Sequence, residues 1–259
     1  MKLLRPRCDR AFTVIELLVV LTIMILLGGL LLPALTRSKV QAAKAGCASN
    51  MKQVTLAFIV WVNDPDPAKD FLPWRVDVAD GGTRNHPSGL QNNAWFQYSW
   101  ISNELLNPRV LACPSDRQAK PADTFSSAGK GGLLNPSYQN AACSYSLGLD
   151  GLTNRIRGSG LIPFELCPEW PLLWDRNADT KRAPTGSCSS GLDPVYQLTV
   201  GSSLWLQKPH YGHGIVGNVG LVDGSVQLTG HNEFNKIIGA SNCRRECSSF
   251  HCLQPRPVP

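Results

Sequence analysis

Two histidines near the C-terminal end stand close to residues that take part in acid–base chemistry. His210 and His213 precede Asp223 and Ser225, and a histidine oriented by a carboxylate can activate a serine as a nucleophile. However, no Gly-x-Ser-x-Gly elbow leads into a helix here, and Asp223 followed by Gly224 is typical of a turn. We therefore interpret these residues as structural, with a packed or hydrogen-bonded histidine beside a hairpin, and we predict no catalytic residue.

Residues that commonly bind metals form two groups, neither with the spacing of a common metal site. The groups are Cys243, Cys247 and Cys252 with His251, and the three histidines His210, His213 and His231. We predict no metal site from these patterns, and zinc at the cysteine-rich group stays an alternative.

One carboxylate lies at the edge of a long apolar segment. Residues 17–35 contain no ionisable side chain, and Glu16 stands directly before them. As a helix these nineteen residues would be about 28 Å long, close to the thickness of one hydrocarbon core. A carboxylate in such a segment costs roughly 2.5 to 3.5 kcal/mol on insertion scales, so we expect Glu16 to have a function.

The surrounding residues resemble the type IV prepilin signal, in which a peptidase cuts before a phenylalanine and a glutamate is fifth in the mature chain. Cleavage between Ala11 and Phe12 would place Glu16 fifth. Ala11 replaces the family's usual glycine, and it is small enough for a tight peptidase pocket. The resemblance implies a leader over residues 1–11, a methylated amine on Phe12, and pairing of Glu16 with the Phe12 amine of an adjacent subunit.

Two other interpretations of the N-terminal segment are an ordinary signal peptide and a plain membrane anchor. Residues 33–37 offer a poor signal-peptidase site, and residues 43–45 lie too far along the chain. Lysine and arginine are nearly balanced on the two sides of the apolar run, so charge alone does not orient it. The prepilin resemblance implies a cytoplasmic leader and an extracytoplasmic head.

Composition favours one folded head behind the anchor. The chain has 259 residues with 43% hydrophobic residues and seven tryptophans, enough for a head of about 190 residues with its own core. The net charge is +6, without a dense basic stripe, so we predict no nucleic-acid partner.

The cysteine count favours disulfides. Loss of the leader would remove Cys8 and leave eight of nine cysteines, an even number typical of disulfides in an exported domain. We expect Cys47 to stay unpaired, because it lies on the core-facing stripe of a helix. The C-terminal three should bond at least one partner in the head, such as Cys188 or Cys167. The candidates for disulfides are Cys143, Cys167, Cys188, Cys243, Cys247 and Cys252.

Periodicity predicts one long helix from Phe12 to about Val62, with a transmembrane half over residues 12–35 and an amphipathic half over residues 36–62. The amphipathic stripe consists of Val40, Ala43, Cys47, Met51, Val54, Phe58 and Trp61. Gly28, Gly29 and Pro33 mark a place where the helix can bend.

The head, residues 63–259, reads as short strands separated by turns. Residues 144–149 and 170–174 are predicted extended, residues 95–100 a short strand or helix, and segments 120–135 and 176–194 loops. Asp223 and Gly224 predict a type I′ turn between two β-prone runs.

Three head segments resemble a pseudopilin-like family abundant in Planctomycetes and Verrucomicrobia. They are Cys-Pro-Ser-Asp within residues 110–116, residues 171–176, and His213 separated by nine residues from Asp223-Gly224. The resemblance implies an α+β, pilin-like fold, with the long helix packed on a mostly antiparallel sheet, and no enzymatic activity. Some pseudopilin heads bind calcium in a late loop, and Asp175, Asp179 and Asp193 are the candidates for it here. They lack the regular alternate-residue spacing of a calcium loop, so we predict no cofactor.

The same resemblance implies a self-assembling subunit of a type II secretion pseudopilus or a type IV pilus-like filament. Its partners would be the prepilin peptidase, other copies and related pseudopilins, the assembly platform and the inner membrane. Two alternatives remain. An exported enzyme on this anchor would show a convergent polar pocket, and a carbohydrate-binding or adhesive tip subunit would show exposed coplanar tryptophans.

Overall fold

The computed structural model describes residues 13–64, 71–127, 129–149, 168–182, 196–199, 205–207, 213–240 and 249–255. The chain forms two compact units, one ending at Ala42 and the other beginning at Ala43. Helix α1, Val14–Val62, belongs to both. The predicted long helix is therefore confirmed, and Pro33 lies inside it without ending it.

The first unit is an apolar helical segment with its side chains exposed. Most large hydrophobic residues between Val14 and Leu35 are more than half exposed, with Val14 at 83%. Among the described residues, α1 is the one helix long and apolar enough to cross a membrane.

The second part of α1 belongs to the core of the head. From Cys47 onward one stripe of the helix is buried, through Met51, Val54 and Phe58 to Val62. These side chains recur at steps of three and four residues, which confirms the predicted amphipathic half. Val40, included in the predicted stripe, is half exposed.

The described residues of the head form a seven-stranded antiparallel sheet with the order β3-β4-β7-β1-β2-β5-β6. The strands are β1 Tyr145–Gly148, β2 Pro171–Asp175, β3 Lys181–Arg182, β4 Tyr196–Thr199, β5 Gly217–Leu221, β6 Val226–Thr229 and β7 Ser249–Leu253. The C-terminal strand β7 lies between β4 and β1, so the end of the chain is held by strand pairing within the sheet.

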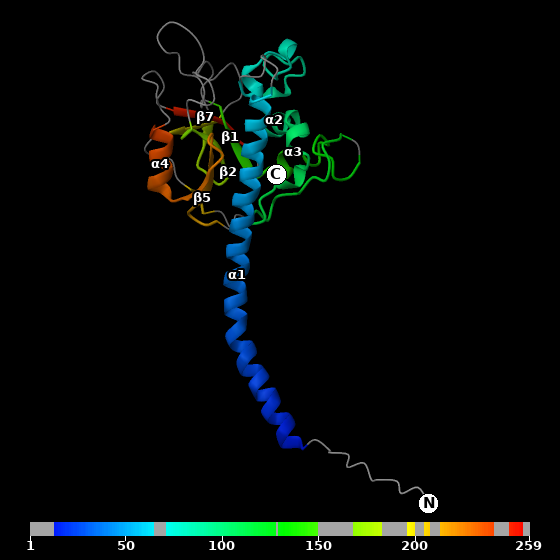
Figure 1. Cartoon of the computed structure of the whole chain (residues 1–259), viewed down its shortest axis with the longest axis vertical. Coiled ribbons are helices and arrows are strands. Elements are labelled where there is room, and N and C mark those ends of the chain that lie inside the picture. Colours follow the sequence, from blue (N-terminus) through cyan, green and yellow to red (C-terminus); the bar gives the residue numbers. More distant parts are fainter. Residues whose placement is uncertain are drawn as a thin grey trace, which may run out of the picture. The chain divides into compact units, whose positions relative to one another are not determined.

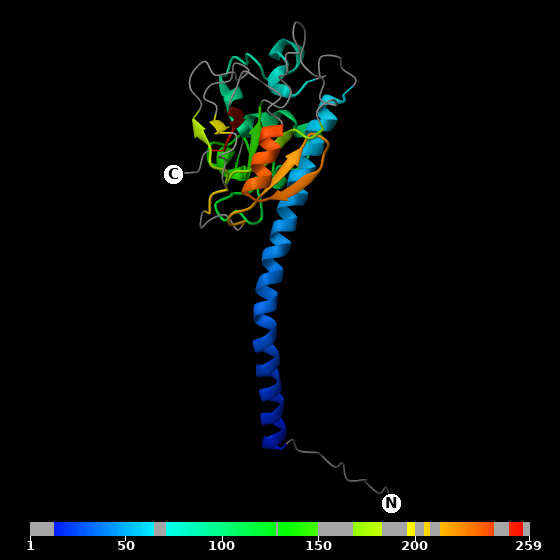
Figure 2. The same ribbon diagram turned by 90° about the vertical axis from the view of Figure 1, so that its left-hand side faces the viewer.

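Helices cover both faces of this sheet. Within the head, α1 lies on one side of the central strands and α4, His231–Ala240, on the other (Figure 1). Figure 2 shows the same arrangement with α4 in front of the sheet. Alternation along β5 explains it: Val219 shares a buried cluster with Phe234 of α4, whereas Gly220 faces Met51 and Thr55 of α1.

Along the chain, short helical segments lie between the end of α1 and the first strand, β1. They are η2 Pro73–Arg75, η3 Val78–Asp80, η4 Leu90–Asn92, α2 Ala94–Trp100, α3 Ser102–Leu105, η5 Pro108–Leu111 and η6 Gln139–Ala142. The segment at residues 95–100 is therefore a helix and not a strand. The extended segments predicted around β1 and β2 are confirmed, as is the lack of regular structure in the described part of 120–135.

The predicted hairpin is present, but the predicted type I′ turn is wrong. Gly224 has a φ of 83°, whereas Asp223 is not among the residues with positive φ, and a type I′ turn needs positive φ at both. Leu221 and Ser225 instead enclose three residues, with hydrogen bonds from Gly224 N to Leu221 O and from Leu221 N to Ser225 O. This is a type I turn followed by a left-handed glycine, the usual three-residue hairpin loop.

Candidate functional site

The site begins with a disulfide between α1 and the turn after η5. Cys47 is bonded to Cys113, with a Cα–Cα distance of 4.7 Å. The prediction that Cys47 stays unpaired is therefore wrong. Its core-facing position was inferred correctly, but the segment that covers it carries the partner cysteine, and Ser115 N also donates to Cys47 Sγ at 3.4 Å.

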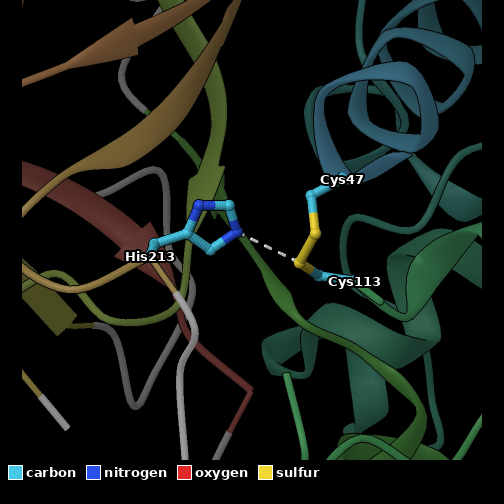
Figure 3. A group of neighbouring side chains, drawn as sticks. All are labelled: Cys47, Cys113 and His213. Carbon is cyan, nitrogen blue, oxygen red and sulfur yellow. Dashed lines mark hydrogen bonds between the residues drawn. A yellow bond between two sulfur atoms is a disulfide. The ribbon is translucent and has the colours of Figure 1, made fainter. Parts of the chain in front are cut away.

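His213 points at this disulfide (Figure 3). Its Nε2 lies 3.2 Å from Cys113 Sγ, and only 4% of the residue is exposed. Burial, aided by the positive charge of Lys44, lowers the pKa of His213 to about 4. The imidazole is thus neutral at physiological pH, with one ring nitrogen directed at sulfur.

A buried carboxylate stands beside the same nitrogen. Asp175 Oδ2 lies 3.8 Å from His213 Nε2 and accepts hydrogen bonds from Asn218 N at 2.7 Å and Asn218 Nδ2 at 3.0 Å. Among the residues that the structure describes, its Oδ1 has no hydrogen-bond partner. Burial raises the pKa of Asp175 to about 7 despite the two bonds from Asn218, so the end of β2 places an acid of near-neutral pKa beside the histidine.

A buried ion pair completes the cluster. Arg176 Nη2 lies 2.6 Å from Asp116 Oδ2, and both side chains are almost fully buried. Ser144 Oγ donates to the same Asp116 oxygen at 2.7 Å, and Arg176 Nη1 donates to the carbonyl of Cys143 at 3.3 Å. The pair joins the segment after η5 to the end of β2, so it fixes the two segments that carry Cys113 and Asp175.

The structure separates two residues that the sequence had grouped. His213 precedes β5 and is buried, whereas Asp223 follows β5, is exposed, and accepts a hydrogen bond from Ser225 N at 2.7 Å. The carboxylate near His213 is therefore Asp175 and not Asp223. Gly224 lies beside Leu56 and Ile59 of α1, where an added Cβ would approach them to 3.3 and 3.4 Å.

Among the described residues, the other candidate metal ligands do not come together in one group. His231 Nδ1 accepts a hydrogen bond from Trp205 N at 3.0 Å, and His251 is buried on β7. Asp175, one calcium candidate, is buried in the cluster. The remaining partners proposed for these groups, His210, Asp193, Cys243 and Cys247, lie outside the described residues.

Of the remaining candidate cysteines, Cys143 and Cys252 are among the described residues and the others are not. Cys143 is a buried free thiol, so the structure does not support it as a disulfide candidate, and burial raises its pKa strongly. Cys252 is buried on β7. Cys167 and Cys188 lie outside the described residues, so bonding of the C-terminal cysteines to them stays a prediction. Strand β7 pairs with β1 and β4, so the C-terminal segment is held in the sheet by strand pairing.

At the N-terminal end, Glu16 has a local partner. Glu16 Oε2 accepts hydrogen bonds from Thr13 N and Thr13 Oγ1, both at 2.8 Å, and Glu16 N donates to Thr13 Oγ1 at 3.3 Å. This is a capping box at the start of α1. Ala11 and Phe12 lie outside the described residues, so cleavage between them stays a prediction.

In the sequence, Asp116 and Arg176 stood out only as parts of longer segments, and neither Ser144 nor Asn218 was predicted as a site residue. The ion pair had a signal, since an aspartate and an arginine each follow a buried apolar run.

No family model matches the chain, and the curated proteins and the solved structures likewise contain no match to it. The Cys47–Cys113 disulfide, His213 and Asp175 are all buried in the head, so a large substrate does not reach this cluster in this conformation.

Proposed function

We propose that this protein is a membrane-anchored, pilin-like structural subunit that assembles into a type II secretion pseudopilus or a type IV pilus-like filament. The observation that carries the proposal is the exposed apolar segment of α1 after Glu16. Its side chains are exposed in the isolated chain, and contiguous apolar surface of this size marks a membrane or protein contact. Inner-membrane lipid before assembly, and neighbouring copies after it, would cover this surface.

The proposed life history follows the prepilin resemblance. A prepilin peptidase removes residues 1–11 in the membrane and methylates Phe12. The head folds outside the membrane, and the assembly platform then brings the apolar helices of several copies together. Within that apolar bundle Glu16 pairs with the Phe12 amine of a neighbour, which fixes the register of the copies.

The two alternatives receive less support. Six of the seven tryptophans are buried, namely Trp61, Trp74, Trp95, Trp170, Trp174 and Trp205, which argues against an adhesive surface of exposed rings. The polar cluster near His213 is also buried, so a substrate would not reach it in this conformation.

Two substitutions separate the capping role of Glu16 from its proposed charge. Glu16→Gln keeps a residue suited to a capping box and removes the negative charge, whereas Thr13→Val removes the cap and keeps the charge. We expect Glu16→Gln to insert into the membrane normally and to lose most filament incorporation. Thr13→Val should assemble at near wild-type yield.

Incorporation is measured by cross-linking between copies in intact cells and by recovery of sheared filaments, with membrane content as the control for insertion. Normal yield for Glu16→Gln, or equal losses for both variants, would show that the charge of Glu16 has no role in assembly.

A further inference from the structure

Three side chains from distant parts of the sequence meet at one point in the core of the head. Cys47 comes from α1, Cys113 from the turn after η5, and His213 from the turn before β5 (Figure 3). All three are buried, and their Sγ and Nε2 atoms lie within 4.8 Å of one another. Two sulfurs and one imidazole nitrogen are a donor set that binds zinc and related thiophilic ions.

We propose that, when the Cys47–Cys113 disulfide is reduced, Cys47, Cys113 and His213 bind one thiophilic divalent transition-metal ion of the zinc class. The disulfide and the metal are alternative states of one site, because the same two sulfur atoms are used in both. This proposal concerns the head alone and does not depend on membrane anchoring or filament assembly.

Conversion of the disulfide into the metal-bound form requires a reductant, for which a dithiol is sufficient. The reductant supplies two electrons and two protons, so that the disulfide breaks, two thiols form, and the reductant becomes a disulfide. The metal ion then displaces the two thiol protons to solvent. The two thiolates neutralise its double positive charge, which makes burial of the ion tolerable.

The surroundings are arranged for such an ion. Nε2 of His213 is directed at Cys113 Sγ at 3.2 Å, and the neutral imidazole is the form that ligates metals. For tetrahedral zinc the sulfurs must move apart from bonding distance to roughly 3.8 Å. Asp175 Oδ2 lies 3.8 Å from Nε2, and its Oδ1 lacks a partner among the described residues, so this carboxylate is a candidate donor for the fourth position.

Cobalt(II) titration of the full chain in detergent tests the proposal. The protein is reduced with a dithiol, freed of it without oxygen, and titrated with Co²⁺, whose bonds to thiolate give intense charge-transfer absorption. We expect the reduced protein to take up one Co²⁺ at this site with such a band, and Zn²⁺ to displace it. In the oxidised protein both sulfurs of this site are in the disulfide. Its charge-transfer band should therefore be weaker than that of the reduced protein, and any remaining absorption would come from other cysteines.

Three variants assign the band to its ligands. His213→Gln leaves the disulfide intact, so its folding is verified in the oxidised state before reduction. It should weaken Co²⁺ binding by more than the roughly 10- to 100-fold that loss of an outer-shell partner costs. Cys113→Ser should abolish the site's charge-transfer band, and Cys143→Ala, which removes a buried thiol outside the group, should leave it unchanged.

Absence of a charge-transfer band in the reduced wild-type protein would overturn the proposal. A band of equal intensity and affinity in His213→Gln and Cys113→Ser would also overturn it, because the ion would then be bound by other cysteines.

Discussion

At the scale of single residues, the head is organised around groups that are expensive to bury and are therefore paired. Arg176 and Asp116 form an ion pair in the core, and Asp175 accepts two hydrogen bonds from Asn218. Such pairs contribute little net stability compared with apolar packing, but losing one partner leaves an uncompensated buried charge. The cluster therefore specifies how the strands and the η5 segment meet.

Asp116→Asn tests the importance of this ion pair. The substitution removes the charge and leaves Arg176 buried without it, so we expect the head to lose about 3 to 5 kcal/mol of unfolding free energy. Urea unfolding of the full chain in detergent, followed by tryptophan fluorescence, gives the value. The matched control is Asp123→Asn, which breaks the exposed Arg109–Asp123 pair and should cost less than about 1 kcal/mol. Equal losses would contradict the assignment.

The buried thiol of Cys143 gives a second prediction at this scale. Burial raises its pKa far above the ordinary value, so the reactive thiolate is scarce at mildly alkaline pH. We expect Cys143 to resist alkylation by iodoacetamide in the native protein and to react readily in guanidinium chloride. Peptide mass mapping identifies the residue. Native modification as fast as in the unfolded chain would show that the thiol is accessible.

At the scale of elements, close packing of α1 on the sheet depends on a glycine in β5. A Cβ at Gly220 would lie 2.7 Å from Thr55 Oγ1 and 3.2 Å from Met51 Cγ, so only glycine lets the strand approach the helix this closely. The hairpin tip continues the contact through Gly224 beside Leu56 and Ile59.

Gly220→Ala should therefore destabilise the head, by about 1 to 3 kcal/mol for overpacking of a filled core. Gly230→Ala is the control, because among the described residues no heavy atom beyond its chain neighbours lies within 4 Å of the added Cβ. Gly230 directly precedes α4, where alanine is a poorer N-cap than glycine, so we expect a loss smaller than that of Gly220→Ala. Urea denaturation of both variants gives the comparison. An unchanged midpoint for Gly220→Ala would mean that the helix and strand are not in contact as described.

The elements that sequence predicted are those with strong local signals. The apolar run, the three–four stripe and Asp-Gly each report on neighbouring residues, so they located α1 and the β5–β6 hairpin. Helix α4 also had such a signal in the spacing of Phe234, Ile237 and Ile238, and it was missed. Strands β4 and β7 were also missed, although their apolar and polar residues alternate; both are short, and they pair with each other across a long stretch of chain.

The site was less predictable than the fold for the same reason. Cys47 and Cys113 are separated by 66 residues, and pairing of cysteines depends on how the helix docks on the head. His213 was singled out with Asp223, its neighbour in the sequence motif, whereas its neighbour in space is Asp175 at the end of β2. A strand of extended chain between His213 and Asp223 puts them at opposite ends of β5.

At the scale of the whole molecule, the chain combines a head with its own buried core and an apolar segment without one. The first has a sheet covered by helices on both faces, and the second exposes its side chains. Water is a poor environment for the second. We propose that lipid, and later other copies, cover that segment, which is why one continuous helix has two such different halves.

We propose that residues 1–11 are a prepilin leader, and the mass of the mature N-terminus shows whether they are removed. The full chain is recovered from membranes of a host that contains a prepilin peptidase, and its N-terminal peptide is analysed by mass spectrometry. A bulky charged residue should block the small pocket of the peptidase, so Ala11→Lys serves as the uncut control. We expect the wild-type chain to begin at Phe12 with a methylated amine. A membrane-resident chain that keeps residues 1–11, or one that has been cut after Ala45, would contradict the account.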